Sequence, residues 1–137
     1  MAFSGTIATT CTVGGTTSST KKTYTSGAMI AITEAVTAST NDQLQAFTLD
    51  LSQCLLFWMN CTVDVTVEFN SNVGGGGTID LIANVPYFFS RTTVGAASDT
   101  HWVETTDITA DITSIYVSVA GATAGTFTAM ALYDPTV

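Results

Sequence analysis

The chain holds few of the side chains that carry out catalysis. Its one histidine, His101, lies beside Trp102 in a polar stretch, and no Gly-x-Ser-x-Gly motif marks a nucleophilic serine. A serine or cysteine nucleophile could therefore be activated only near His101. Asp64 and Glu68 are four residues apart, about 13 Å on an extended strand, which is too far for the carboxylate pair of a glycosidase. We therefore expect a protein that is not an enzyme.

Side chains that bind metals or cofactors are equally sparse. With three cysteines, one histidine and no Cys-x-x-Cys spacing, the chain does not offer a four-ligand zinc site. Oxygen ligands suited to calcium lie closer together, although not at EF-hand spacing: Asp99, Glu104, Asp107 and Asp111. We expect no bound cofactor, and we expect the thiols of Cys11, Cys54 and Cys61 to be reduced and at least partly buried.

The charge balance excludes two classes of partner. Lys21, Lys22 and Arg91 stand against eleven Asp and Glu, which gives a formal net charge of −8. Three cations cannot neutralise a run of phosphates, so the composition argues against binding to nucleic acid or to an anionic membrane. Because only 10% of the residues are charged, the hydroxyls of threonine and serine must keep much of the surface hydrated.

The chain reads as short strands separated by glycine and small polar residues. The stretch Val63–Phe69 alternates apolar and polar residues, which is typical of a strand with one buried face. The continuously apolar stretch Cys54–Met59 indicates a strand buried on both faces, with Trp58 in the core. The other expected strands are Phe3–Val13, Ala28–Ile32, Leu44–Leu51, Ile79–Leu81, Tyr87–Phe89, Ile115–Val119 and Phe127–Tyr133.

No sustained helical periodicity is present, and the strands recur about every ten residues. This pattern predicts an all-β fold, a single-domain antiparallel β-sandwich of jelly-roll type with about eight short strands. Residues 1–26 are expected to form a Thr/Ser/Gly-rich N-terminal strand and an arm, and residues 27–137 the sandwich. The polar stretches 16–20 and 37–43 are expected to be connections. Asp64 and Glu68 are expected on the wet face of their strand, where they would block edge pairing.

Several segments together resemble a known class of proteins. They are an apolar strand that ends at Asn60, an alternating strand, a Gly-rich turn, the segment IDLIANVPYFF and the terminal FTAMALYDPT. This pattern resembles the small β-sandwich virion proteins of tailed phages, the head decoration or cement proteins, over the last two-thirds of the chain. Such proteins commonly have glycine where Asn84 stands, and asparagine also tolerates a left-handed turn. The pattern contains no diagnostic motif, so no functional residue is carried over.

The resemblance implies a non-enzymatic virion structural protein that stabilises an assembled phage head from the capsid surface. Its partners would be the lattice of the major capsid protein and copies of itself, in a homo-oligomer for which a trimer is favoured. The residues expected to contact partners are Lys21, Lys22, Tyr24, Arg91, His101 and Trp102. Two alternatives stay open: a carbohydrate-binding module that uses Trp102, and a surface-adhesion domain that uses calcium.

Overall fold

The computed structural model describes residues 1–72, 77–91, 108 and 110–136. In this part of the chain the regular structure consists of ten strands and a three-residue 3-10 helix, η1 (Leu51–Gln53). The strands are β1 (Phe3–Val13), β2 (Thr16–Ser26), β3 (Ala28–Val36), β4 (Thr40–Gln45), β5 (Cys54–Cys61), β6 (Val65–Phe69), β7 (Thr78–Leu81), β8 (Tyr87–Ser90), β9 (Ile115–Val119) and β10 (Gly125–Tyr133). The predicted all-β class is confirmed.

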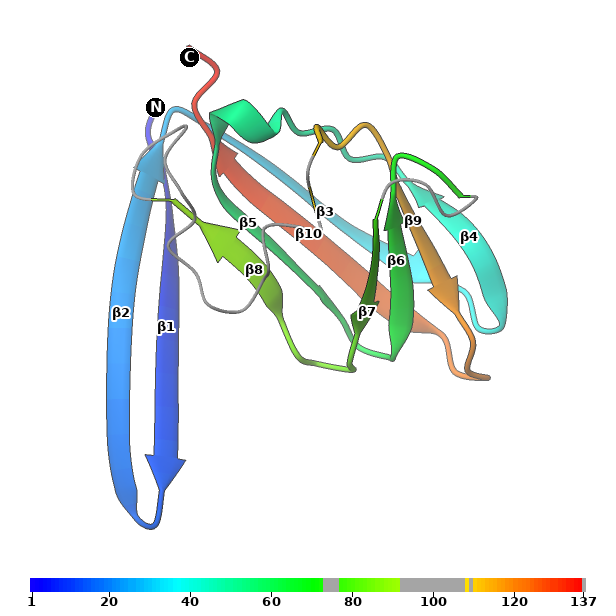
Figure 1. Ribbon diagram of the computed structural model, residues 1–137, viewed down its shortest axis with the longest axis horizontal. Coiled ribbons are helices and arrows are strands. Elements are labelled where there is room, and N and C mark those ends of the chain that lie inside the picture. The colour runs from blue at the N-terminus through cyan, green and yellow to red at the C-terminus, as the bar shows by residue number, and fades with distance from the viewer. Residues whose placement is uncertain (73–76, 92–107, 109, 137) are drawn as a thin grey trace.

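Eight of these strands form the two sheets of a sandwich (Figure 1). One sheet has the order β3-β10-β5-β8 and the other the order β4-β9-β6-β7, and all neighbours are antiparallel. The pairs are nested, because β3 pairs with β10, β4 with β9, β5 with β8 and β6 with β7. Nested pairs divided alternately between two sheets make a jelly roll, so the predicted sandwich is confirmed.

The core lies between the two sheets and is aromatic at its centre. The alternating residues Val65, Val67 and Phe69 of β6 are buried in it, as the sequence predicts. Phe57 enters from the opposite sheet, and its ring centre lies 5.8 Å from that of Phe47 and 6.5 Å from that of Phe69, both in edge-to-face contact. Edge-to-face pairs add to the free energy of burial, so these rings tie the two sheets together.

The remaining two strands, β1 and β2, form a hairpin that projects from the sandwich (Figure 1). We call residues Phe3–Ser26 the arm. Its strands pair without a break from Phe3↔Ser26 to Val13↔Thr16. The prediction that residues 16–20 form a connection is therefore wrong, because a run of hydroxyl residues shows no apolar alternation and its extended form depends on pairing with β1. The prediction for residues 37–43 holds for residues 37–39 and is wrong from Thr40 on for the same reason, since the polar β4 is set by pairing with β9.

The apolar stretch of β5 faces two different environments. Phe57 and Met59 point into the core, whereas Leu56 on the opposite face is buried against the arm. Trp58 lies on that same outer face and is half-buried. The prediction of a core position for Trp58 is wrong, because the arm covers only part of the outer face.

Two acidic residues lie in a different setting from the one predicted. β6 is an inner strand between β9 and β7, so Asp64 and Glu68 do not block an open edge. Asp64 instead accepts a hydrogen bond from the backbone N–H of Ala83 at 2.7 Å. The turn that follows contains Asn84 at φ 61°, the left-handed conformation that asparagine tolerates.

All three cysteines are free, as predicted, but they differ in exposure. Cys54 and Cys61 are buried in the sandwich, whereas Cys11 is exposed on the arm. The expectation of a partly buried Cys11 is wrong, because nothing in the described chain packs against that part of the hairpin. Burial raises the pKa of the Cys54 thiol to about 12, although the charge of Arg91 acts in the opposite direction.

Candidate functional site

The arm is the element most distinct from the sandwich, and its tip is defined by two glycines. Gly14 and Gly15 have φ values of 56° and 82°. Positive φ at both central residues makes the two-residue type I′ turn, whose twist matches that of paired strands. Beside the turn, the hydroxyls of Thr12 and Thr17 form a cross-strand hydrogen bond of 2.9 Å. The tip is therefore an ordered hairpin end.

The base of the arm is fixed to the sandwich by two hydroxyl groups. Tyr24 is buried, and its hydroxyl lies 2.6 Å from the hydroxyl of Ser90, at the end of β8. Ser26 is also buried, and its hydroxyl donates a hydrogen bond to the carbonyl of Tyr133. Buried hydroxyls without partners would be costly, so these bonds fix both the position and the direction of the arm.

Apolar packing completes this base. Leu56 and Leu132 are buried under the arm, with Phe3 and Ile7 packed beside them. Gly5 lies directly above the two leucines, and a Cβ there would be 2.9 Å from a methyl group of each. The absence of a side chain at Gly5 therefore lets β1 approach the sheet closely.

Beyond this base the arm has no contact with a core. Every residue from Ala8 to Thr23 is exposed. Because side chains alternate along a strand, Lys22 shares the sandwich-facing side of β2 with Tyr24, and Lys21 lies on the opposite side. The Lys22 ammonium lies 5.2 Å from the centre of the Tyr24 ring. Lys21 is paired across the hairpin with Ala8, so its side chain stands among small residues on the outward face.

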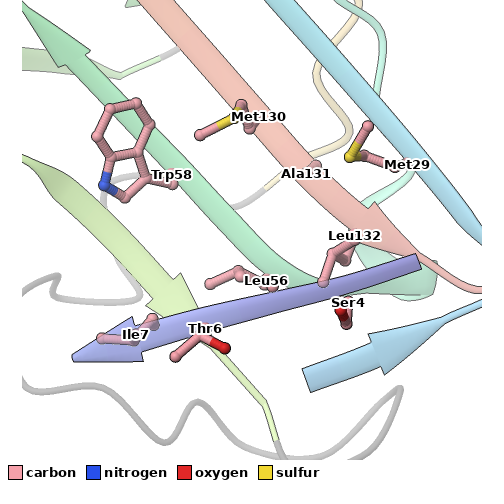
Figure 2. Close-up of a pocket in the computed structure, with 10 residues that line it drawn as sticks. Ser4, Thr6, Ile7, Met29, Leu56, Trp58, Met130, Ala131 and Leu132 are labelled. Atoms are coloured by element: carbon pink, nitrogen blue, oxygen red, sulfur yellow. The ribbon is translucent and has the colours of Figure 1, made fainter. Parts of the chain in front are cut away.

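An apolar hollow lies between β1 and the outer face of the β3-β10-β5-β8 sheet (Figure 2). Its volume is about 410 Å³, and Trp58 and Met130 rise from the sheet on one side of it, with Ile7 on the arm. Met29 and Met130 are 48% and 39% exposed, so two large apolar side chains meet solvent at this hollow. A second hollow, of about 420 Å³, lies on the β8 side of the arm and shares Trp58 and Ile7. The arm thus overhangs a surface able to take up apolar groups.

The cations and aromatic residues expected to contact partners fall in different places. Lys21 and Lys22 lie exposed on the arm, while Tyr24 is buried at its base. Arg91 is half-buried, its Nη1 donates to the Leu51 carbonyl at 2.6 Å, and its guanidinium lies 5.6 Å from the centre of the Phe89 ring. Arg91 therefore links β8 to η1, and among the expected contact residues that the structure describes, the two lysines are the exposed ones.

Other predicted residues lie outside the described part of the chain. They are His101, Trp102 and three of the four candidate calcium ligands, Asp99, Glu104 and Asp107. The fourth, Asp111, accepts a hydrogen bond from the backbone N–H of Leu51 at 2.9 Å. Among the described residues, no three His, Cys, Asp or Glu side chains lie close enough together to hold a metal ion. No helix in that part is long and apolar enough to cross a membrane.

Comparison of the chain with protein-family models, with curated proteins and with solved structures finds no match.

Sequence reasoning did not find the hollow or the second strand of the arm. A signal for the strand is present, because Gly-Gly between two stretches of β-branched residues is a typical type I′ hairpin sequence. The hollow has no such signal. Leu56, Trp58 and Met130 belong to two strands far apart in sequence, and only the register of β10 on β5 brings Trp58 beside Met130.

Proposed function

We propose that the protein is a non-enzymatic virion structural protein, a decoration or cement protein that binds an assembled phage head. The observation that carries this proposal is the arm, a paired hairpin whose residues Ala8–Thr23 are all exposed. The arm would lie on the lattice of the major capsid protein, and the jelly roll would remain on the outside of the shell.

The length of the arm supports a binding role. A two-stranded hairpin is only marginally stable alone in water, because it has no core to offset the loss of chain entropy. Here the residues from Ala8 to Thr23 bury no side chain in the sandwich, since Phe3, Ile7 and Tyr24 make the apolar contacts at the base. An arm of this kind gains stability when a partner covers one of its faces or edges.

The chemistry of the arm suits a protein surface as partner. Its side chains are mostly those of threonine and serine, which are short and uncharged. Such groups can be buried at an interface at little cost when their hydroxyls find partners there, whereas buried charges must be paired. The phage-head assignment itself rests on the resemblance of the segments around β5–β8 and β10 to decoration proteins, and the jelly-roll fold is compatible with it.

The experiment is to look for the protein in purified phage particles and to mix the isolated protein with shells that lack it. We expect saturable co-sedimentation at a fixed ratio to the major capsid protein. Absence from particles, together with failure to co-sediment with its own shells, would overturn the proposal. A control protein of similar size and net charge should stay in the supernatant, because it lacks the arm.

A further inference from the structure

The charges of the chain are separated between the arm and the sandwich. Residues 1–26 contain Lys21 and Lys22 and no Asp or Glu, whereas residues 27–137 contain Arg91 and all eleven Asp and Glu. The side chains of the first segment therefore sum to +2 and those of the second to −10, which together give the net charge of −8. The arm is thus the one cationic element on a strongly acidic protein.

The outer face of the β4-β9-β6-β7 sheet offers carboxylates to a cationic partner. Asp64, Glu68 and Asp80 lie on this face, in or beside the paired strands β6 and β7. Asp80 Oδ1 accepts a hydrogen bond from the Thr66 hydroxyl at 2.8 Å, and Asp64 Oδ1 is held by the N–H of Ala83. One oxygen of Glu68 is buried and has no hydrogen-bond partner in the described part of the chain. We call this surface the acidic face.

A hollow on the acidic face has the composition that a lysine side chain requires. It measures about 280 Å³ and is lined by Asp64 and Asp80 together with Thr66, Ser118 and Ile82. Ile82 is 65% exposed, so it can pack against the methylene groups of a lysine. The two carboxylates can then receive the ammonium group, which combines apolar contact with charge pairing.

The arm cannot reach the acidic face of its own molecule. Its base packs on Leu56 and Leu132, on the outer face of the β3-β10-β5-β8 sheet. The acidic face belongs to the other sheet, on the far side of the sandwich (Figure 1). Pairing of two arms through their β2 edges is disfavoured where it brings the lysines of two copies side by side, and β1 offers no carboxylate to receive them. Charge complementarity therefore points to the acidic face of a second copy.

We propose that copies of this chain associate head to tail, with the outward face of one arm on the acidic face of the next copy. Lys21 enters the hollow between Asp64 and Asp80, and the neighbouring threonine hydroxyls of the arm face the hydroxyls of Thr66 and Ser118. The contact joins two different surfaces, so it closes into a ring when the rotation between copies permits, for which the favoured trimer is one solution. This inference rests on the proposed role of the arm in binding a partner.

The first test measures self-association of the intact protein by sedimentation velocity at low and high salt. We expect an oligomer at low salt that dissociates at 1 M salt, where screening shortens the range of the charges to about 3 Å. Lys21→Glu should weaken the association about tenfold or more, because it places like charges together. Thr48→Glu, which adds a negative charge at an exposed position between β4 and η1, is the control and should have little effect. An intact protein that stays monomeric at every concentration overturns the inference, as does an unchanged Lys21→Glu oligomer.

A charge exchange then tests which surface the arm binds. Lys21→Glu and Asp80→Lys should each give monomers alone, whereas an equimolar mixture of the two variants should recover association. In the mixture the Glu arm of one variant meets the Lys face of the other, and the unaltered Lys21 arm meets the unaltered acidic face, so the two variants alternate and form dimers or even-membered oligomers. Failure of the mixture to associate contradicts the assigned surface. Asp64→Asn/Asp80→Asn removes charge but keeps both hydrogen-bond acceptors, so it should fold and associate weakly even if Asp80→Lys disturbs the sheet.

The two proposals fail in different ways. A monomer that still binds phage shells stoichiometrically overturns head-to-tail association and leaves the decoration role intact. An oligomer that depends on Lys21 and Asp80 but never binds shells supports the self-association and overturns the decoration role.

Discussion

The arm and the jelly roll use the same strand geometry for opposite purposes. In the jelly roll, Phe57, Phe69 and Val117 are 0% to 1% exposed, and each strand has one face in the core. In the arm, both faces beyond Ala8 are exposed, and pairing between two strands is the main source of order. The comparison indicates that the jelly roll provides the free energy of folding and the arm provides a surface. Changes in the two regions should therefore have different consequences.

The largest effect is expected in the aromatic core. Phe57→Ala removes a fully buried ring that contacts Phe47, Phe69 and Phe89, and it should lower the free energy of unfolding by about 3–5 kcal/mol. Thr10→Ala on the arm is the matched control and should change it by less than about 0.5 kcal/mol. Urea denaturation followed by tryptophan fluorescence measures both. Equal losses of unfolding free energy in the two variants would contradict the claim that the core, and not the arm, provides the free energy of folding.

A smaller effect is expected where the two regions meet. Tyr24→Phe keeps the ring but removes the hydroxyl that lies 2.6 Å from that of Ser90. The change removes this hydrogen bond and should lower the free energy of unfolding by about 1–2 kcal/mol. Because the base of the arm is then held less firmly to the sandwich, the arm should also become more sensitive to limited proteolysis.

The double variant Tyr24→Phe/Ser90→Ala supplies the control for this contact. Removing both hydroxyls should lower the free energy of unfolding by less than the sum of the two single changes, since each single change already removes the hydrogen bond between them. Strictly additive costs would show that the hydrogen bond does not hold the arm.

The next effect should be confined to the arm tip. Gly15→Ala forces a side chain into a φ of 82° and should cost about 1–2 kcal/mol locally. Because the tip touches no core, the melting temperature of the protein should stay the same, while amide exchange near residues 12–17 becomes about tenfold faster. Gly121→Ala is the control, since a Cβ there has open space and no positive φ. A clear fall in melting temperature for Gly15→Ala alone would show that the tip contributes to the fold.

Much of the jelly roll could be predicted because apolar and polar residues alternate along its strands, so the sequence shows which residues are buried. The alternation of Val65, Val67 and Phe69 and that of Ile115, Val117 and Val119 match buried inward faces. Strands without such alternation were missed. β4 is largely polar and the second strand of the arm consists of hydroxyl residues and lysines, so both depend on their partner strands for an extended form.

The candidate site was predicted less completely. Lys21 and Lys22 could be predicted as partner-contact residues because cations are rare in this chain, and both lie exposed on the arm. The internal roles of Tyr24 and Arg91 depend on Ser90 and Leu51, which are 66 and 40 residues away in sequence. The acidic face is formed by β6, β7 and the turn between Leu81 and Tyr87. It lies on the opposite side of the sandwich from the arm, and this arrangement depends on how the two sheets pack, which the sequence does not show.

The most direct measurement uses a chain with a shortened arm, in which residues 10–19 are replaced by Asn-Gly. Thr9 and Thr20 are paired across the hairpin, so Asn-Gly can connect them through a type I′ turn. Lys21, Tyr24 and Ser26 are retained. The free energy of unfolding should stay within about 0.5 kcal/mol of that of the intact protein, while binding to phage shells in co-sedimentation should fall tenfold or more. A loss of more than about 2 kcal/mol, or unchanged binding to shells, would contradict the claim that the arm is a binding element separate from the folding core.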